Sequence, residues 1–381
     1  MKPLSQKVLD IKPSGIRKFF DLVQSSEDII SLGVGEPDFS TPWNVTEYAI
    51  YQLEKGYTSY TSNYGILELR REIAKFLQSQ FASQYIPETE ILITVGVSEG
   101  LDLVFRTLIN PGDEVIVPIP NYVSYVPLVE LAGGVAVTVD TSKSDFILTR
   151  ELLEKAITPK TVAVIIGYPN NPTGAMVSEK QLIDIVDVVK HHDLWLVSDE
   201  VYNQMVYEAK PLSASTYLKE NLILLNGFSK AYAMTGWRIG YVACTAEVMH
   251  QMVKVHQYNI LCAPVMAQYA ALEALRRGQK DVEKMRQSYE MRRNFIYEGL
   301  KEIGFEVQKP TGAFYIFPSI TKFGLSDEDF AMRLLQEGRV AVVPGSAFAE
   351  GVHGFIRCCY AASMSDLKEA LKRIGQFVHR L

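Results

Sequence analysis

The chain has 381 residues, which is too long for one simple core. Hydrophobic residues make up 48% and charged residues 22%, a composition typical of globular proteins. Its formal net charge of −6 gives no electrostatic support to a nucleic-acid-binding role, and no apolar run has the length of a transmembrane helix or a secretory signal. The four cysteines have neither metal-site spacing nor the number of a disulfide framework, which predicts a reducing, cytoplasmic setting without a bound metal.

Short apolar runs between residues 91 and 244 predict the strands of a sheet that is covered on both faces. Helical patterns separate several of these runs, and Ser178 with Gln181 has the spacing of a capping box at the start of one helix. This alternation predicts an α/β fold with a largely parallel sheet. The expected strands are Ile91–Gly96, Glu114–Pro118, Val135–Asp140, Val162–Gly167, Leu194–Asp199, Leu222–Gly227 and Ile239–Cys244.

The pattern changes near Gly278 and predicts a second, smaller α+β domain. A long charged helix should follow, then strands at Ala313–Phe317 and Val340–Val343, and a last helix with its N-cap at Ser365. The turn-rich first 45 residues are expected to pack on this domain. The predicted large domain is therefore 46–278, and the small domain consists of 1–45 and 279–381.

The segment Gly96–Gly100 follows a predicted strand and opens a predicted helix. Backbone N–H groups at such a helix start bind phosphate, which makes Val97, Ser98 and Glu99 candidate anion ligands. Glu99 can act only through its backbone N–H, with its carboxylate turned away. Many ordinary connections between strands and helices also contain glycine and serine, so a purely structural turn is the alternative.

Four further side chains take positions at or after the carboxyl ends of predicted strands, where ligands bind in open α/β sheets. Tyr122 and Asn171 each follow a strand, and Asp199 ends one, with Tyr202 three residues beyond it. Each has a structural alternative: a core aromatic residue for the tyrosines, a turn for Asn171 and a helix cap for Asp199.

Lys230 lies just beyond the apolar strand Leu222–Gly227, with Ser229 beside it and Arg238 two turns later. Desolvation lowers the pKa of a lysine and exposes its nucleophilic neutral form. Lys230 is therefore expected to form a Schiff base with an aldehyde cofactor whose phosphate Arg238 holds. The alternative is a solvated lysine, since lysine side chains are mostly exposed.

Pyridoxal 5′-phosphate is an aldehyde cofactor whose requirements match these candidates. An ionised Asp199 would keep its pyridine nitrogen protonated and so make the ring an electron sink. Tyr202 and Asn171 would be donors for the ring hydroxyl oxygen, and Tyr122 would offer a face on which the ring stacks.

Arg357 lies in the mostly apolar segment Gly354–Ala361, where a guanidinium needs an anionic partner. A substrate α-carboxylate fits through a bidentate pair, and an internal salt bridge is the alternative. The adjacent Cys358 and Cys359 are expected to pack as small core residues.

With these motifs in this order, the chain resembles the class I/II aminotransferases, which are fold-type I pyridoxal-phosphate enzymes. The resemblance runs over nearly the whole chain, from Gly33–Phe39 through the lysine segment Gly227–Gly240 to Arg357. One departure is Cys358-Cys359, where relatives often carry Ser-Tyr. Details similar to the bacterial and archaeal aromatic or broad-specificity branch are Ser14–Phe19, Thr58–Tyr60, Lys254–Asn259 and Gly312–Phe317.

The resemblance implies a seven-stranded, mostly parallel sheet flanked by helices, and a homodimer in which Tyr60 reaches the phosphate of the partner's cofactor. It implies catalytic roles for Lys230, Asp199 and Tyr202. The implied phosphate ligands are Val97, Ser98, Glu99, Ser229 and Arg238; the ring ligands are Tyr122, Asn171, Asp199 and Tyr202; the carboxylate ligands are Gly35, Asn171 and Arg357. Ile16, Tyr64, Tyr258 and Asn259 are candidate walls of the substrate side-chain pocket.

The implied activity is ping-pong transamination through pyridoxamine phosphate, between an aromatic or broad-specificity L-amino acid donor and a 2-oxo acid such as 2-oxoglutarate. An aspartate-type or N-acetyl-diaminopimelate-type aminotransferase, or a C–S β-lyase on the same fold, is the alternative. A non-enzymatic sensor module is disfavoured because no basic helix-turn-helix precedes residue 40. The expected partners are small amino and 2-oxo acids, with no nucleic acid and no membrane.

Overall fold

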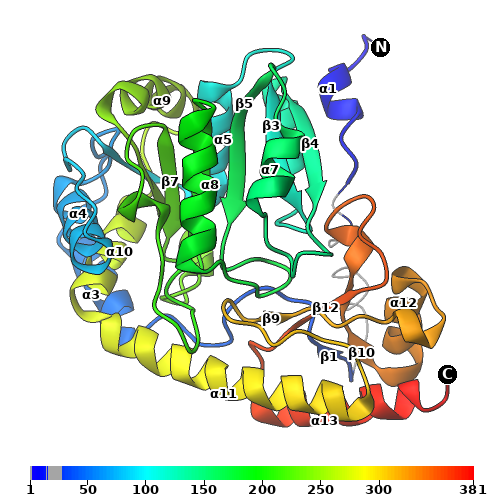
Figure 1. Ribbon diagram of the computed structural model, residues 1–381. Coiled ribbons are helices and arrows are strands. Elements are labelled where there is room, and N and C mark those ends of the chain that lie inside the picture. Colours follow the sequence, from blue (N-terminus) through cyan, green and yellow to red (C-terminus); the bar gives the residue numbers. More distant parts are fainter. Residues whose placement is uncertain (1, 14, 16–27) are drawn as a thin grey trace.

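The computed structural model describes residues 2–13, 15 and 28–381, and its centre is a seven-stranded sheet (Figure 1). The strands follow the order β2-β8-β7-β6-β5-β3-β4. Strand β8 runs in the opposite direction to the other six. All seven predicted strands are confirmed, with ends that shift by a few residues. Their bounds are β2 Ile91–Thr94, β3 Glu114–Ile119, β4 Val135–Asp140, β5 Thr161–Gly167, β6 Trp195–Asp199, β7 Leu222–Gly227 and β8 Gly240–Ala243.

Helices cover both faces of this sheet, as its continuous apolar strands require. One buried cluster joins the sheet to α5 (Gly96–Leu108), α6 (Tyr125–Ala132) and α9 (Ala246–Asn259). A second cluster joins it to α7 (Arg150–Ala156) and α8 (Glu179–His191). The predicted capping box is confirmed: Ser178 Oγ accepts from the Gln181 backbone N–H, and the Gln181 side chain accepts from the Ser178 N–H.

The C-terminal part forms the predicted smaller α+β unit. An antiparallel sheet has the order β11-β12-β9, and β1 pairs parallel with β10. The expected N-cap at Ser365 was wrong: Ser363 accepts from the Asp366 N–H and starts the last helix two residues earlier. The bounds are β1 Ile30–Ser31, β9 Tyr315–Ile316, β10 Val340–Ala341, β11 Val343–Pro344, β12 Ile356–Cys359, α11 Gln279–Ile303, α12 Asp327–Gly338 and α13 Met364–Val378.

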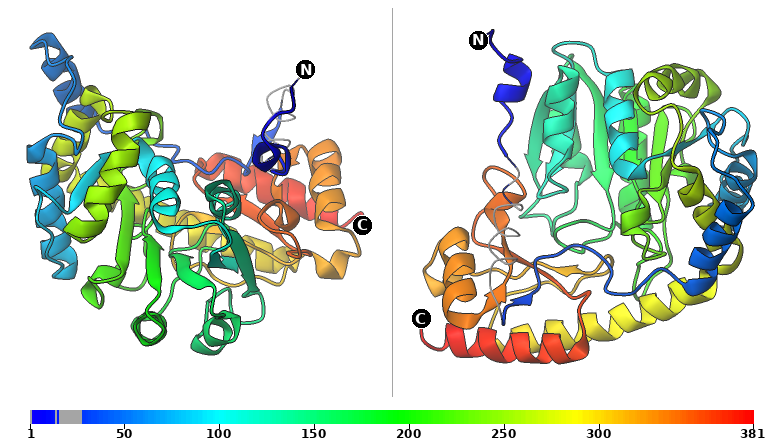
Figure 2. Two further views of the ribbon diagram at one scale, coloured as in Figure 1. Left: turned by 90° about the horizontal axis from the view of Figure 1, so that it is seen from above. Right: turned by 180° about the vertical axis from the view of Figure 1, so that it is seen from behind.

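The other α-helices in the described part of the chain are α1 (Gln6–Leu9), α3 (Trp43–Glu54), α4 (Leu67–Phe81) and α10 (Val265–Arg277). Figure 2 shows α3 and α4 at one end of the molecule and α12 and α13 at the other, with the chain after β1 crossing between them. Residue 46 falls inside α3, which packs on α10 of the large part. We therefore propose that the large domain begins with this helix, at Trp43, and ends at residue 278 as expected. None of the helices within the described ranges is both long and apolar enough to cross a membrane.

Candidate active site

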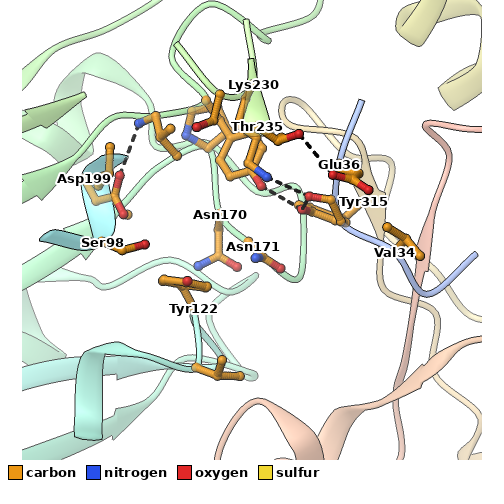
Figure 3. Close-up of a pocket in the computed structure, with 18 of the residues that line it drawn as sticks. Val34, Glu36, Ser98, Tyr122, Asn170, Asn171, Asp199, Lys230, Thr235 and Tyr315 are labelled. Atoms are coloured by element: carbon orange, nitrogen blue, oxygen red, sulfur yellow. Dashed lines mark hydrogen bonds between the residues drawn. The ribbon is translucent and has the colours of Figure 1, made fainter. Parts of the chain in front are cut away.

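A cavity of about 910 Å³ lies between the carboxyl ends of the large-sheet strands and the small β9–β12 sheet. In the view of Figure 3, Asp199 and Ser98 lie on one side and Tyr315 and Val34 on the other. The structure brings most of the sequence-predicted residues together here. Those that line the cavity are Gly35, Val97, Ser98, Tyr122, Asn171, Asp199, Tyr202, Ser229, Lys230, Arg238 and Arg357.

The turn from β2 into α5 lines the cavity with Val97 and Ser98, and the guanidinium of Arg238 packs against this turn. Gly96 has a φ of +71°, and a Cβ there would lie 2.8 Å from Arg238 Nη2, so only glycine lets the arginine pack against the turn. The start of a 13-residue helix beside an arginine suits a phosphate group.

Glu99 does not line the cavity, because its carboxylate turns back toward the protein. One carboxylate oxygen accepts from the Val95 N–H at 2.5 Å, and the other lies 2.6 Å from His256 Nδ1. His256 is fully buried on α9 and was not predicted from the sequence. The pair removes the awkward carboxylate from the neighbourhood of an anion, and it leaves the backbone of the turn facing the cavity.

Asp199 is a buried carboxylate at the end of β6. It accepts from Tyr125 Oη at 2.8 Å and from the Val201 N–H at 3.2 Å. Burial raises its pKa to about 6, although both hydrogen bonds and the charge of Lys230 oppose that shift. A protonated ring nitrogen beside it would favour the ionised form of this carboxylate, which burial alone disfavours. The ionised carboxylate would in turn keep the ring nitrogen of pyridoxal phosphate protonated.

The hydrogen bond from Tyr125 to Asp199 was not predicted from the sequence. Tyr125 is 74 residues from Asp199, and its hydroxyl passes so close to Gly167 that a Cβ there would lie 2.5 Å from it. The tyrosine hydroxyl holds one carboxylate oxygen and the Val201 N–H holds the other, and together they fix the orientation of the carboxylate.

Lys230 has its amine inside the cavity, with Nζ donating to the Gly35 carbonyl oxygen at 2.7 Å. Burial lowers its pKa to about 8, and Arg357 and Arg238 add to that shift, whereas Cys359 and Glu36 oppose it. The neutral amine, which is the form that attacks an aldehyde, is therefore much more populated near physiological pH than in an ordinary lysine.

Arg357 is a buried arginine of β12, with 2% of its surface exposed. Its Nη1 donates to Asn171 Oδ1 at 2.9 Å and its Nη2 to the Gly33 carbonyl at 2.5 Å, while its buried Nε has no partner. Across residues 2–13, 15 and 28–381, no carboxylate forms an ion pair with it. The ring of Tyr315 lies 4.5 Å from the guanidinium carbon. A buried cation of this kind suits a carboxylate ligand.

Several predicted positions lie elsewhere. Tyr60 and Tyr258 are 83% and 87% exposed and do not line the cavity of their own chain, and neither do Tyr64 and Asn259. Ile16 lies outside the described residues. Cys358 and Cys359 are both buried, which confirms that they pack as core residues.

Comparison with known proteins agrees with this geometry. Residues 27–374 match the family described as aminotransferase class I and II. The chain is 49% identical over 380 residues to a putative aminotransferase, YugH, of Bacillus subtilis, covering 99% of this chain and 98% of that one. It is 45% identical to aromatic-amino-acid aminotransferase 2 of Thermococcus litoralis, covering 97% of each.

A solved structure extends the likeness to the fold. Aspartate aminotransferase from Thermus thermophilus with maleate superposes with a TM-score of 0.94 at 38% identity, over 99% of this chain and 100% of that one. The sequence match, the sheet order and the lysine in the cavity agree, and so this protein belongs to the class I and II aminotransferases, fold-type I enzymes that use pyridoxal phosphate.

Proposed function

We propose that the enzyme transfers the amino group of an aromatic L-amino acid to a 2-oxo acid such as 2-oxoglutarate, in a ping-pong reaction. The observation that carries this choice of donor is the lining of the cavity. Besides Tyr122, which is assigned to the cofactor ring, the described residues Val34, Val123 and Tyr315 supply apolar and aromatic surface. The described basic residues of the cavity are Lys230, Arg238 and Arg357, each with a role already, and Glu36 adds a negative charge.

Pyridoxal phosphate, when bound, supplies the aldehyde that takes up the amino group and the ring that stabilises a negative charge at the substrate Cα. Lys230 would act first as the nucleophile toward that aldehyde and then as the base that removes the Cα proton and delivers it to the cofactor's former aldehyde carbon. Asp199 holds the proton on the ring nitrogen. Tyr202 and Asn171 donate to the ring oxygen, and Tyr122 covers one face of the ring.

The phosphate would bind at the start of α5, to the backbone of Val97, Ser98 and Glu99, with Ser229 and Arg238 on its other side. The support is the glycine turn at Gly96, which the Arg238 guanidinium fills. Arg357, Asn171 and the Gly35 backbone would hold the substrate α-carboxylate, because Arg357 is a buried cation with an unpaired Nε.

Substitution of Arg357 by lysine should raise the KM for the amino acid by about 10- to 100-fold, because a charge-assisted hydrogen bond contributes about 1.5–3 kcal/mol. The lysine keeps the charge and loses the planar pair of donors. Steady-state kinetics measure the change. Arg70→Lys is the matched control: Arg70 is 6% exposed and donates to the carbonyls of Gly65 and Pro87, away from the cavity. An unchanged KM in Arg357→Lys contradicts the assignment.

We also propose a homodimer, in a cytoplasmic setting that suits four unpaired cysteines. Large apolar side chains are exposed on α3, on the loop that follows it, at the end of α9 and at the start of α10, and such a surface marks an interface. They are Trp43, Ile50, Tyr51, Leu53, Tyr57, Tyr60, Tyr258, Ile260, Leu261 and Met266.

If Tyr60 reaches the phosphate in the partner subunit, two inactive variants should complement each other. A hybrid of one Tyr60→Ala chain and one Lys230→Ala chain has one site in which the lysine and the partner's tyrosine are both intact. Mixed, refolded chains should therefore regain activity that neither variant shows alone. No recovery in confirmed hybrids means that Tyr60 acts within its own chain or not at all.

The choice of donor is tested by half-reactions. The cofactor-loaded protein is mixed with one amino acid at a time, and loss of its visible absorbance is followed. Phenylalanine, tyrosine and tryptophan should react faster than aspartate or N-acetyl-diaminopimelate. Pyruvate and ammonia release from a cystathionine-like substrate measures the β-lyase reaction. Faster conversion by aspartate would overturn the aromatic assignment and leave transamination intact.

A further inference from the structure

Tyr315 places a hydroxyl group between the Tyr202 hydroxyl and the Gly35 carbonyl, two groups to which the proposed function gives separate roles. It is 1% exposed on β9, and its Oη lies 2.7 Å from Tyr202 Oη and 3.2 Å from the Gly35 carbonyl oxygen. That carbonyl also accepts from Lys230 Nζ at 2.7 Å. One carbonyl therefore faces two donors, and one hydroxyl faces two acceptors. In Figure 3, Tyr315 lies on the side of the cavity where Val34 and Glu36 also lie.

The position of this hydroxyl is tightly fixed. A Cβ on Gly35 would lie 2.6 Å from Tyr315 Oη, so the backbone approaches as closely as glycine allows. Tyr315 pairs with Cys359 of β12, and its ring lies 4.5 Å from the guanidinium carbon of Arg357 on the same strand. Burial raises the pKa of Tyr315, which keeps the proton on its oxygen. The hydroxyl can change its hydrogen-bond acceptor only by rotation of that proton.

A tyrosine hydroxyl has one proton and donates one hydrogen bond at a time. While Lys230 donates to the Gly35 carbonyl, that oxygen has a charged or neutral amine as partner, and Tyr315 is free to donate to Tyr202. When the lysine leaves, a buried carbonyl without a donor is unfavourable, and Tyr315 is the donor within reach.

Which oxygen accepts the hydrogen bond of Tyr315 determines whether Tyr202 can donate its own proton to a ligand. Tyr202 also has a single proton. If it donates to Tyr315, that proton is not available to a ligand in the cavity. If it accepts from Tyr315, its own proton is free, and hydrogen bonds in a chain strengthen one another.

We propose that Tyr315 is a positioning residue whose hydrogen bond alternates between Tyr202 and the Gly35 carbonyl according to whether Lys230 occupies that carbonyl. The free lysine amine thereby makes Tyr202 a stronger donor to the ring oxygen of the cofactor. This coincides with the stage at which the amine is needed as a base. The inference depends on the proposed cofactor contact of Tyr202.

Tyr315→Phe tests the role of the hydroxyl, because it keeps the ring beside Arg357. Loss of one buried hydrogen bond should weaken the affinity of the cofactor-free protein for pyridoxal phosphate by about 5-fold. The visible absorption band of the bound cofactor should shift in the same direction as in Tyr202→Phe. In steady-state kinetics kcat should fall while the KM for the amino acid stays unchanged, since the Arg357 contact is kept.

The double variant Tyr202→Phe/Tyr315→Phe separates action through Tyr202 from an independent effect. Its cofactor affinity should be no weaker than that of Tyr202→Phe alone. Tyr360→Phe is the matched control, because that buried tyrosine donates to the Ala313 carbonyl at 3.2 Å, outside the cavity. It should change neither the affinity nor the absorption band.

Two results would overturn the proposal. One is a Tyr315→Phe protein with wild-type affinity and an unshifted band; the other is a double variant in which the two single losses multiply. Failure of the underlying cofactor contact is distinguishable, because Tyr202→Phe alone would then leave both the affinity for pyridoxal phosphate and the absorption band unchanged.

Discussion

Lys230→Ala should lower turnover by about 10⁴-fold or more, since the variant loses both the nucleophile and the group that moves the Cα proton. The amine lies inside the cavity with a pKa of about 8, and no other lysine lines that cavity among the described residues. The visible absorbance that the bound cofactor owes to the lysine should disappear as well. Turnover and absorbance spectra measure the two effects on the same sample.

The matched control is Lys190→Ala. Lys190 Nζ also donates to a backbone carbonyl, that of Tyr217 at 3.0 Å, but it lies on an exposed part of α8. This variant should keep full activity and absorbance. If Lys230→Ala retained both activity and visible absorbance, the assignment of Lys230 would be wrong, regardless of the result for Lys190→Ala.

Asp199→Asn should lower kcat by about 10²- to 10³-fold, the cost typical of losing one preorganised electrostatic partner in an active site. The amide keeps the shape and can still accept from Tyr125 Oη, and what disappears is the negative charge beside the ring nitrogen. Cofactor affinity, measured by titration of the cofactor-free protein, should weaken together with kcat.

Glu200→Gln controls for the loss of any buried carboxylate at this place. Glu200 is the next residue, burial raises its pKa to about 7, and it accepts from the Ala214 N–H without lining the cavity. Its variant should retain kcat even if its stability changes. Equal losses in the two variants would indicate a structural effect and would count against a role of Asp199 at the ring.

The large sheet could be predicted from the sequence because most of its strands are short apolar runs separated by helical patterns, which is typical of strands covered on both faces. The positions of Asp199 and Lys230 followed, since a residue after such a strand must lie at its carboxyl end. The sequence assigns no role to Tyr315, which lies in the segment Gly312–Phe317 that resembles the aromatic or broad-specificity branch of the family.

The partners of these residues could not be predicted. Tyr202 and Tyr315 are 113 residues apart, and Glu99 and His256 are 157 apart. Such contacts depend on how two sheets and several helices pack, which no local periodicity encodes. The N-cap of the last helix was missed for a smaller reason: Ser363 and Ser365 both have oxygen acceptors, and only backbone geometry decides which one caps.

The hydrogen bond from Arg357 to the Gly33 carbonyl joins residues 324 positions apart, and it has a consequence for biosynthesis. Lys230, Asp199 and the turn at Gly96 are all synthesised well before Arg357. The residues assigned to the phosphate and the ring are therefore synthesised while the carboxylate site still lacks β12. Recognition of the substrate carboxylate cannot be complete until both ends of the chain have been made and have come together.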